Sequence, residues 1–234
     1  MKMGELHKKK MITRPDFKQE RKLWQYQNKL IVACDEAGRG SLAGPVVAAA
    51  FLIKNVKEKI PKPPIELRDS KQLSFHQREI LFDWIKKQKN FYFATAKSSH
   101  RLIDKINIRQ ANFLAMKKAI KTLVKKSNLK KFIIFVDGRE EIPDIKQKQF
   151  TFIKGDAKVF SLACASIVAK VTRDRWVIEE SKKYPNYDFE IHKGYGTKLH
   201  FRKIKKYGLS EIHRKSFLRR LNKEKSGPKN SENK

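Results

Sequence analysis

The sequence predicts an α/β fold in which a mixed central sheet is flanked by helices. Short apolar segments of strand length alternate with longer segments whose apolar residues recur at helical spacing. A glycine-rich turn, residues 38–45 (GRGSLAGP), separates the first two apolar segments, and an Asp-Gly pair ends a later one. At 234 residues the chain is long enough for one sizeable hydrophobic core with an appendage.

The first half of the chain predicts three strands and one helix. Residues 30–34 (LIVAC) and 46–53 (VVAAAFLI) are continuously apolar, and residues 91–96 (FYFATA) alternate as a strand does. Between them, Ser74 opens the sequence S-F-H-Q, in which Gln77 stands at the third position of a capping box. A helix is therefore expected from Ser74 to about Lys87.

The second half predicts two helices and two strands. A helix from about 108 to 126 follows from the spacing of Ile108, Ala111, Ala115, Ala119, Thr122 and Leu123. Residues 131–138 (KFIIFVDG) are expected to form a buried strand, and residues 150–156 (FTFIKGD) another. A helix from Val159 to about Ser181 carries a face of mostly small residues: Ala163, Ser166, Ala169 and Lys170.

The ends of the chain differ from this pattern. Residues 1–28 form a basic N-terminal extension, charged and aperiodic at first and loosely compatible with a helix over 16–27. Residues 222–234 (NKEKSGPKNSENK) have the composition of a disordered tail. The expected catalytic domain is thus residues 29–221.

The charge indicates a polyanionic partner. Lys and Arg number 55 against 24 Asp and Glu, a formal charge of +31, and a phosphate backbone is the commonest partner for such an excess. An anionic membrane surface is the rival, but no basic amphipathic helix with a clean apolar face supports it. The uncharged stretch 41–53 is too short to span a bilayer.

Cysteine use and the N-terminus favour a cytoplasmic protein. Cys34 and Cys164 both lie in apolar segments and are expected to be buried thiols and not a disulfide. The basic start MKMGELHKKK leads into no apolar signal-peptide core.

Four carboxylates stand where predicted strands end: Asp35 and Glu36, Asp137, and Asp156. If the strands ending at Asp35 and Asp137 are parallel neighbours, these side chains converge and repel one another unless a cation neutralises them. Mg²⁺ takes such oxygen ligands, and two ions can promote phosphodiester hydrolysis. Each acid alone also fits a turn, or for Asp156 a helix cap. Local acids in a basic chain favour the metal site.

Seven motifs, in order, are similar to those of bacterial ribonuclease HII. They span about residues 29–218 and are DEAGRG (35–40), DSKQLS (69–74), VDG (136–138), KGD (154–156), ASIVAKVTRDR (165–175), HKGYGT (192–197) and HRKSF (213–217). The resemblance implies a ribonuclease H-like fold with a C-terminal helical region at about 182–221. It also implies a Mg²⁺- or Mn²⁺-dependent endonuclease, with two ions during catalysis, that acts on the RNA of RNA–DNA hybrids and nicks duplex DNA 5′ of embedded ribonucleotides.

The resemblance also implies roles for individual residues. Asp35, Glu36, Asp137 and Asp156 match the family's catalytic, metal-binding carboxylates. Gly38, Arg39 and Gly40 match the turn that contacts the ribonucleotide, whose 2′-OH separates RNA from DNA. Tyr195 matches the tyrosine that senses the RNA–DNA junction. Further candidates for phosphate contacts are Lys71, Lys170, Arg173 and Lys193.

Two other classes of protein remain as alternatives. A non-catalytic basic nucleic-acid-binding protein would keep the lysines but needs no four acids at strand ends. A DNA nuclease or transferase with the same acids needs no ribose-sensing turn. The N-terminal 28 residues are too short for the folded N-terminal domain of ribonuclease HIII, and the six histidines show no zinc spacing. A monomer is expected.

Overall fold

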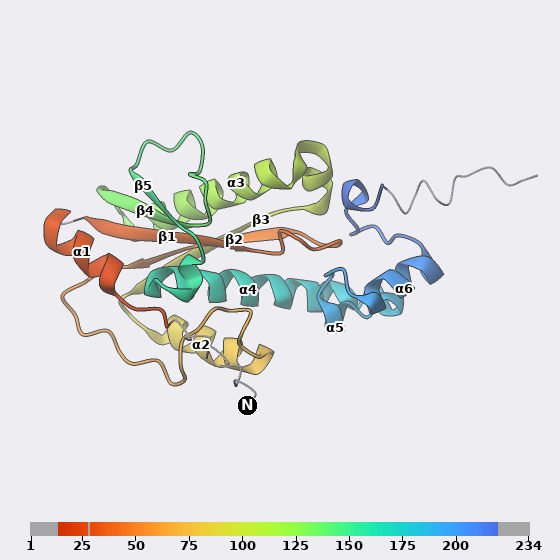
Figure 1. Ribbon diagram of the computed structural model, residues 1–234, viewed down its shortest axis with the longest axis horizontal. Helices are drawn as coiled ribbons and strands as arrows, with labels where there is room; N and C mark the ends of the chain where they lie inside the picture. The colour runs from red at the N-terminus through yellow and green to blue at the C-terminus, as the bar shows by residue number, and fades with distance from the viewer. Residues whose placement is uncertain (1–13, 28, 220–234) are drawn as a thin grey trace, which may run out of the picture.

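One five-stranded mixed sheet forms the centre of the protein (Figure 1). A computed structural model describes residues 14–27 and 29–219. The sheet order is β3-β2-β1-β4-β5, in which β1 pairs antiparallel with β2 and parallel with β4. The mixed sheet predicted from the sequence is confirmed. The strands are β1 Leu30–Ala37, β2 Val46–Ile53, β3 Phe91–Ser98, β4 Phe132–Asp137 and β5 Gln149–Phe152.

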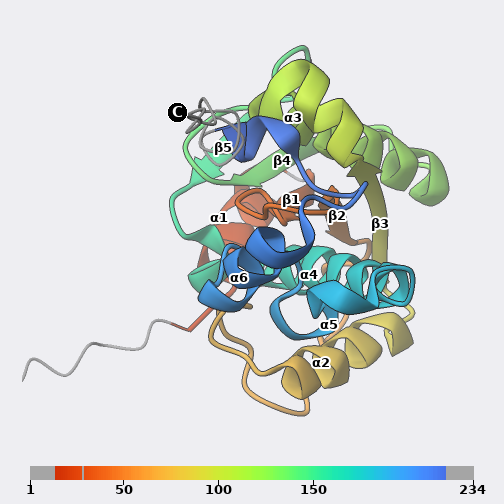
Figure 2. The same ribbon diagram turned by 90° about the vertical axis from the view of Figure 1, so that its right-hand side faces the viewer.

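Helices cover both faces of the sheet, as Figures 1 and 2 show. Helix α3 (His100–Ser127) lies on one face, and α4 (Phe160–Ser181) lies on the other, with α2 (Phe75–Lys87) packed against it. The short helices α5 (Phe189–His192) and α6 (Lys198–Tyr207) lie beyond the C-terminal end of α4. Helix α1 is Lys18–Gln27, and 3₁₀ turns span Gly155–Ala157, Pro185–Tyr187 and Lys215–Phe217.

The alternation of side chains along the strands divides the core into two clusters. Odd-numbered residues of β1 and β4, such as Ala33 and Phe135, pack with α4. Even-numbered residues, such as Cys34 and Val136, pack with α3. Successive side chains of a strand point to opposite faces. The same parity therefore decides which way each carboxylate of these two strands points.

Several element boundaries differ from the predicted ones. Strand β1 continues to Ala37, so Asp35 and Glu36 lie inside it and not after it. Strand β5 ends at Phe152 because the chain turns at Lys154, which has a φ of 56°. Helix α3 begins at His100, since Ser99 caps it, and non-helical geometry at Asn107 interrupts it where the predicted helix was to start. The capping box of Ser74 and Gln77 on α2 is confirmed.

Helix α1 packs against the core. Glu20 is fully buried, and its Oε1 accepts hydrogen bonds from Ser161 N and Ser161 Oγ, both at 2.8 Å. A carboxylate at this position caps α4 from another helix and is favoured by the helix dipole. The ring of Phe17 stacks on Phe160 at 4.1 Å between centroids. The first 13 residues and the predicted tail at 222–234 lie outside the described residues.

The structure also bears on the two cysteines and on membrane-spanning helices. Cys34 and Cys164 are both buried free thiols, as predicted. Among residues 14–27 and 29–219, no helix has the length and apolar character needed to cross a bilayer.

Candidate active site

The parallel pairing of β1 with β4 places two carboxylates side by side. Ala33 is the partner of Phe135 in the sheet, so Asp35 and Asp137, two residues further along each strand, share the α4 face. Asp156 lies in the 3₁₀ turn that follows β5. One carboxylate oxygen from each of these three residues lies within 4.8 Å of the others. The predicted convergence of Asp35 and Asp137 is confirmed, and the structure adds Asp156 to them.

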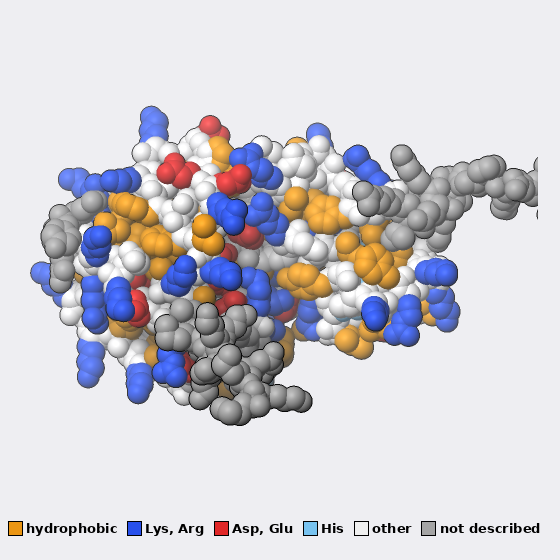
Figure 3. Space-filling model, viewed as in Figure 1, with side chains coloured by type: hydrophobic (Ala, Val, Ile, Leu, Met, Phe, Trp, Pro, Cys, Tyr) orange, Lys and Arg blue, Asp and Glu red, His pale blue; other side chains and the backbone are white. Residues whose placement is uncertain are grey.

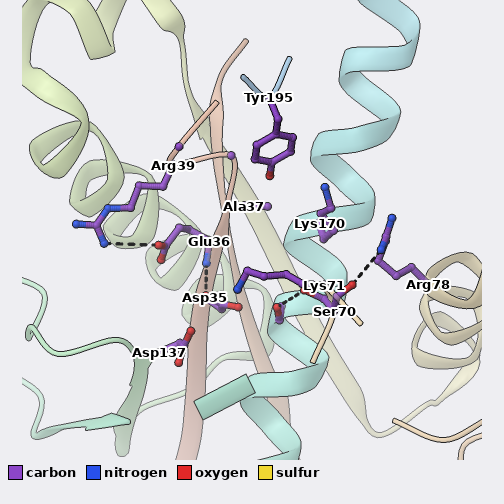
Figure 4. Close-up of a pocket in the computed structure, with 13 residues that line it drawn as sticks. Asp35, Glu36, Ala37, Arg39, Ser70, Lys71, Arg78, Asp137, Lys170 and Tyr195 are labelled. Carbon is purple, nitrogen blue, oxygen red and sulfur yellow. Dashed lines mark hydrogen bonds and ion pairs between the residues drawn. The ribbon is translucent and has the colours of Figure 1, made fainter. Parts of the chain in front are cut away.

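Glu36 lies beside this cluster but on the opposite face of the sheet, as Figure 4 shows. Its position next to Asp35 in β1 turns its side chain towards α3, where it approaches Asn112. Its Oε1 is 3.8 Å from Arg39 Nη1. The sequence prediction put Glu36 after the strand, which left the direction of its side chain open. The observed strand turns it to the α3 side, from which it still lines the same cavity as Asp35 and Asp137.

Burial and mutual repulsion both disfavour the ionised forms of the three clustered acids. Burial raises the pKa of Asp35 well above its ordinary value, and Glu36 and Asp137 raise it further. Burial also raises the pKa of Asp137, and burial together with Asp137 raises the pKa of Asp156 to about 6. Asp156 Oδ2 is buried without a hydrogen-bond partner, and the exposed Lys71 Nζ lies 3.7 Å from it. These oxygens fit a hard divalent cation, which would supply the missing positive charge.

Short-range contacts hold the acids in place. Asp137 Oδ1 accepts a hydrogen bond from Gly155 N at 2.6 Å. A Cβ on Gly155 would lie 2.8 Å from Phe152 Cβ and 2.5 Å from a methyl carbon of Leu162, so this close approach favours glycine. Asp35 Oδ1 accepts a hydrogen bond from Glu36 N at 2.7 Å, and the nearby Ser166 of α4 lowers the pKa of Asp35 against the effect of burial. The N-cap of α4 is Val159, so the alternative role of Asp156 as a side-chain cap of that helix is not observed.

A cavity of about 430 Å³ opens above the acids. Its walls come from β1, from the loop that follows it, from the loop before α2 and from α4 (Figure 4). On the molecular surface in Figure 3, Asp and Glu side chains lie among surrounding Lys and Arg side chains. The predicted site residues that line the cavity are Asp35, Glu36, Gly38, Arg39, Gly40, Lys71, Asp137, Lys170 and Tyr195.

The loop at residues 38–44 is held between two C-terminal segments. Leu42 N donates to Gly194 O at 2.8 Å, and Gly44 N donates to Ile212 O at 2.9 Å. The backbone of Tyr195 pairs with Ser41 of this loop, and its ring faces α4, with Lys170 Nζ and the Arg173 guanidinium carbon each 4.8 Å from its centroid. Packing of the C-terminal region thus brings Tyr195 to the loop, although 155 residues separate it from Gly40.

The predicted basic contacts have different surroundings. Lys71 and Lys170 face the cavity, and Lys170 Nζ also pairs with Asp174 at 2.9 Å. Arg173 is 0% exposed, and its Nη2 donates to Ser41 Oγ at 2.7 Å. Its predicted phosphate contact does not fit this burial, which leaves the guanidinium bonded to protein. Lys193 donates to Glu190 O and lies over the ring of Phe75, outside the cavity.

Several residues that shape the site were not predicted from the sequence. Ser70 Oγ and Ser166 Oγ are 2.9 Å apart, which joins the 69–74 loop to α4, and Arg78 Nη1 donates to Ser70 O at 2.9 Å. Arg214 is fully buried and bonds to the loop at 38–44. Motif positions were the available signal, because Ser70, Ser166 and Arg214 lie in three of the quoted motifs.

The fold and the acid cluster together define a class of protein: a nucleic-acid hydrolase with carboxylates at the ends of the central parallel strands. Comparisons with known proteins agree. The family model for Ribonuclease HII matches residues 32–220. Ribonuclease HII of Fusobacterium nucleatum is 48% identical over 200 residues, 85% of this chain and 90% of that protein. Ribonuclease HII of Caldicellulosiruptor saccharolyticus is 49% identical over 88% of this chain and 95% of its own length.

Solved structures show the same fold at lower identity. Ribonuclease H2 of Pyrococcus horikoshii has a TM-score of 0.64 at 24% identity, covering 83% of this chain and 98% of that one. A ribonuclease HIII described as a complex with Mn²⁺ has a TM-score of 0.57 at 17% identity, covering 77% and 63%. The chain belongs to the ribonuclease HII family. It is an endoribonuclease, a hydrolase with ribonuclease H activity on RNA–DNA hybrids, and its fold is ribonuclease H-like.

Proposed function

We propose that this endoribonuclease also nicks duplex DNA on the 5′ side of an embedded ribonucleotide, by metal-dependent hydrolysis at Asp35, Glu36, Asp137 and Asp156. The observation that carries the proposal is one cavity with two functional parts. Asp35 and Asp137 line it and lie within 4.8 Å of Asp156, and the loop at 38–40 and Tyr195 line the same cavity. The first part suits phosphodiester hydrolysis, and the second suits selection of the nucleotide to be cut.

The carboxylates are the proposed ligands of Mg²⁺ or Mn²⁺. Asp35, Asp137 and Asp156 offer clustered oxygens, and Glu36 reaches the same cavity from the other side of β1. When bound, two such ions would activate a water and stabilise the leaving oxygen. The fold neighbour described with Mn²⁺ supports the choice of a divalent cation. We propose that two ions bind during catalysis and that they are Mg²⁺ or Mn²⁺.

The loop and Tyr195 are the proposed ribonucleotide sensors. Gly38 and Gly40 have no side chains, so backbone groups can approach a sugar closely. Tyr195 presents a half-buried ring beside the loop. A ring in this position can pack on the deoxyribose 3′ of the ribonucleotide, where a 2′-OH would be crowded. Lys71 and Lys170, at the cavity wall, are the proposed phosphate contacts.

The remaining expectations follow from the charge. A formal charge of +31 favours a phosphate-backbone partner. We propose that the protein is a cytoplasmic monomer and that it acts on RNA–DNA hybrids and on duplexes that contain ribonucleotides. Most of the affinity should then come from Lys and Arg, and it should fall as salt is raised.

A duplex DNA with a single ribonucleotide tests the proposed function. The protein is incubated with this duplex in Mg²⁺ or Mn²⁺, and the labelled strands are separated on a denaturing gel. We expect one cut, with the ribonucleotide retained on the downstream fragment, and no cut without a divalent cation. The matched control is an all-DNA duplex of the same sequence. Cleavage of that control would indicate a DNA nuclease, and an intact ribonucleotide duplex would contradict the proposal.

A further inference from the structure

Arg214 bonds to three carbonyl oxygens of a single loop. Its Nε donates to Gly44 O at 2.9 Å, its Nη1 to Arg39 O at 2.9 Å and its Nη2 to Gly38 O at 2.7 Å. The side chain is 0% exposed and comes from a segment that lies 170 or more residues further along the chain. All three nitrogens of the guanidinium are therefore engaged with the loop at 38–44.

These bonds fix the direction of the neighbouring amide groups. In a trans peptide the C=O and N–H groups point in opposite directions, and the described residues contain no cis peptide bond. When Arg214 holds the carbonyls of Gly38 and Arg39, the N–H groups of Arg39 and Gly40 must point away from it. Both of those residues are exposed and line the cavity. Adjacent N–H groups turned to one side form a concave site suited to an anion or a sugar hydroxyl.

A second buried arginine, Arg173, packs against the inner side of the loop at 38–44. Arg173 donates to Ser41 Oγ, and a Cβ on Gly38 would lie 2.3 Å from its Nε. Burial, and then the charge of Arg173, lowers the pKa of Arg214 to about 9, so Arg214 stays charged at neutral pH. A planar guanidinium can bond to carbonyls along several directions at once, whereas a lysine ammonium cannot reproduce that fork. The loop at 38–44 therefore packs against two positively charged side chains, Arg173 and Arg214, that are both buried.

We propose that Arg214 is a positioning residue, which holds the loop at 38–44 in the conformation that accepts the ribonucleotide. The C-terminal segment is then part of ribose selection although it does not line the cavity. This inference rests on the proposed function of the loop at 38–40. It goes beyond that function because it assigns the geometry of the loop to a buried residue that does not line the cavity.

The test compares Arg214→Lys and Arg214→Met with the full-length wild-type protein. We expect both variants to cleave the one-ribonucleotide duplex about 100-fold more slowly at saturating enzyme in single-turnover conditions, the loss expected when reacting groups shift by about 1 Å. Their affinity for an all-DNA duplex, measured in chelator, should stay near the wild-type value. Free methylguanidinium should partly restore cleavage to a third variant, Arg214→Ala.

Two further measurements separate positioning from general stability. Tyr187→Phe is the matched control, because it removes a buried hydroxyl that donates to Gly208 O in the same C-terminal region. This control should lower the melting temperature without slowing cleavage. Amide hydrogen exchange in the peptide covering 38–44 should rise in the Arg214 variants and not in the control.

Two results would overturn the inference. One is wild-type exchange in the loop of a folded Arg214→Lys protein, and the other is full cleavage by that variant. Failure of the wild-type protein to cut the ribonucleotide duplex would instead contradict the proposed function, and the exchange measurement would still decide whether Arg214 holds the loop.

Discussion

Gly38 shows how a single residue shapes the site. Its φ is +91°, a conformation that residues with a side chain rarely adopt. A Cβ there would also lie 2.3 Å from Arg173 Nε and 2.9 Å from Pro45 O. The resemblance to the family marks Gly38 as a substrate contact, and the structure adds a second requirement, since the buried Arg173 needs the space that a side chain would fill.

Gly38→Ala should therefore slow cleavage of an RNA–DNA hybrid by at least about tenfold, which corresponds to about 1.4 kcal/mol. The matched control is Gly208→Ala. Gly208 has a similar φ of +79°, but no atom lies within 4 Å of the Cβ that would be added there. Single-turnover rates and melting temperatures of both variants make the comparison. Equal rates in the two variants would show that contact with Arg173 has no bearing on activity.

At the scale of elements, three buried histidines join α5, α6 and the segment at 210–214. His200 Nδ1 lies 2.9 Å from Tyr195 O, which can only accept, so that nitrogen carries a proton. His213 Nδ1 accepts from Ser210 N at 2.8 Å, so its proton is on Nε2, which is 3.0 Å from His200 Nε2. The neutral rings thus form one directed chain that ends at the carbonyl of Tyr195, and His192 stacks on His200 at 4.1 Å.

The buried, hydrogen-bonded histidines predict that the protein loses stability in acid. Burial lowers the pKa of His200 from 6.5 to about 3 and that of His213 to about 4. Between pH 6.5 and these values the unfolded state binds more protons than the folded state, so the free energy of unfolding falls as the pH falls. Each histidine should contribute a loss of about 2 kcal/mol between pH 7.5 and pH 5.

Urea unfolding at these two pH values measures the effect. His200→Gln should reduce the difference in unfolding free energy between pH 7.5 and pH 5, because the amide does not titrate. The exposed His76 provides the control, and His76→Gln should leave the difference unchanged. If the free energy of unfolding of His200→Gln kept the wild-type pH dependence, the buried histidines would not control stability in acid.

For the molecule as a whole, strand and helix periodicity predicted the mixed sheet and its flanking helices, because burial on one or both faces imposes that pattern directly. The convergence of Asp35 and Asp137 followed from parallel pairing. The direction of Glu36 did not, since it depends on one strand boundary. Burial of Arg173 and Arg214 was also out of reach, because lysines and arginines on the surface and under a loop look alike in a sequence. Whether such a side chain is buried depends on contacts between segments that are far apart in the sequence.

We propose that the clustered acids hold the divalent cation for cleavage, while Lys and Arg supply most of the affinity for the duplex. Asp137→Asn removes one charged ligand from this cluster, and Asp144→Asn, at a carboxylate that is 84% exposed, is the matched control. We expect Asp137→Asn to slow Mg²⁺-dependent single-turnover cleavage of the one-ribonucleotide duplex by about 10³-fold or more, about 4 kcal/mol. Its affinity for the same duplex at low salt, measured in chelator, should stay close to that of the wild-type protein. Near-normal cleavage by a folded Asp137→Asn protein would show that the clustered acids do not hold the catalytic cation.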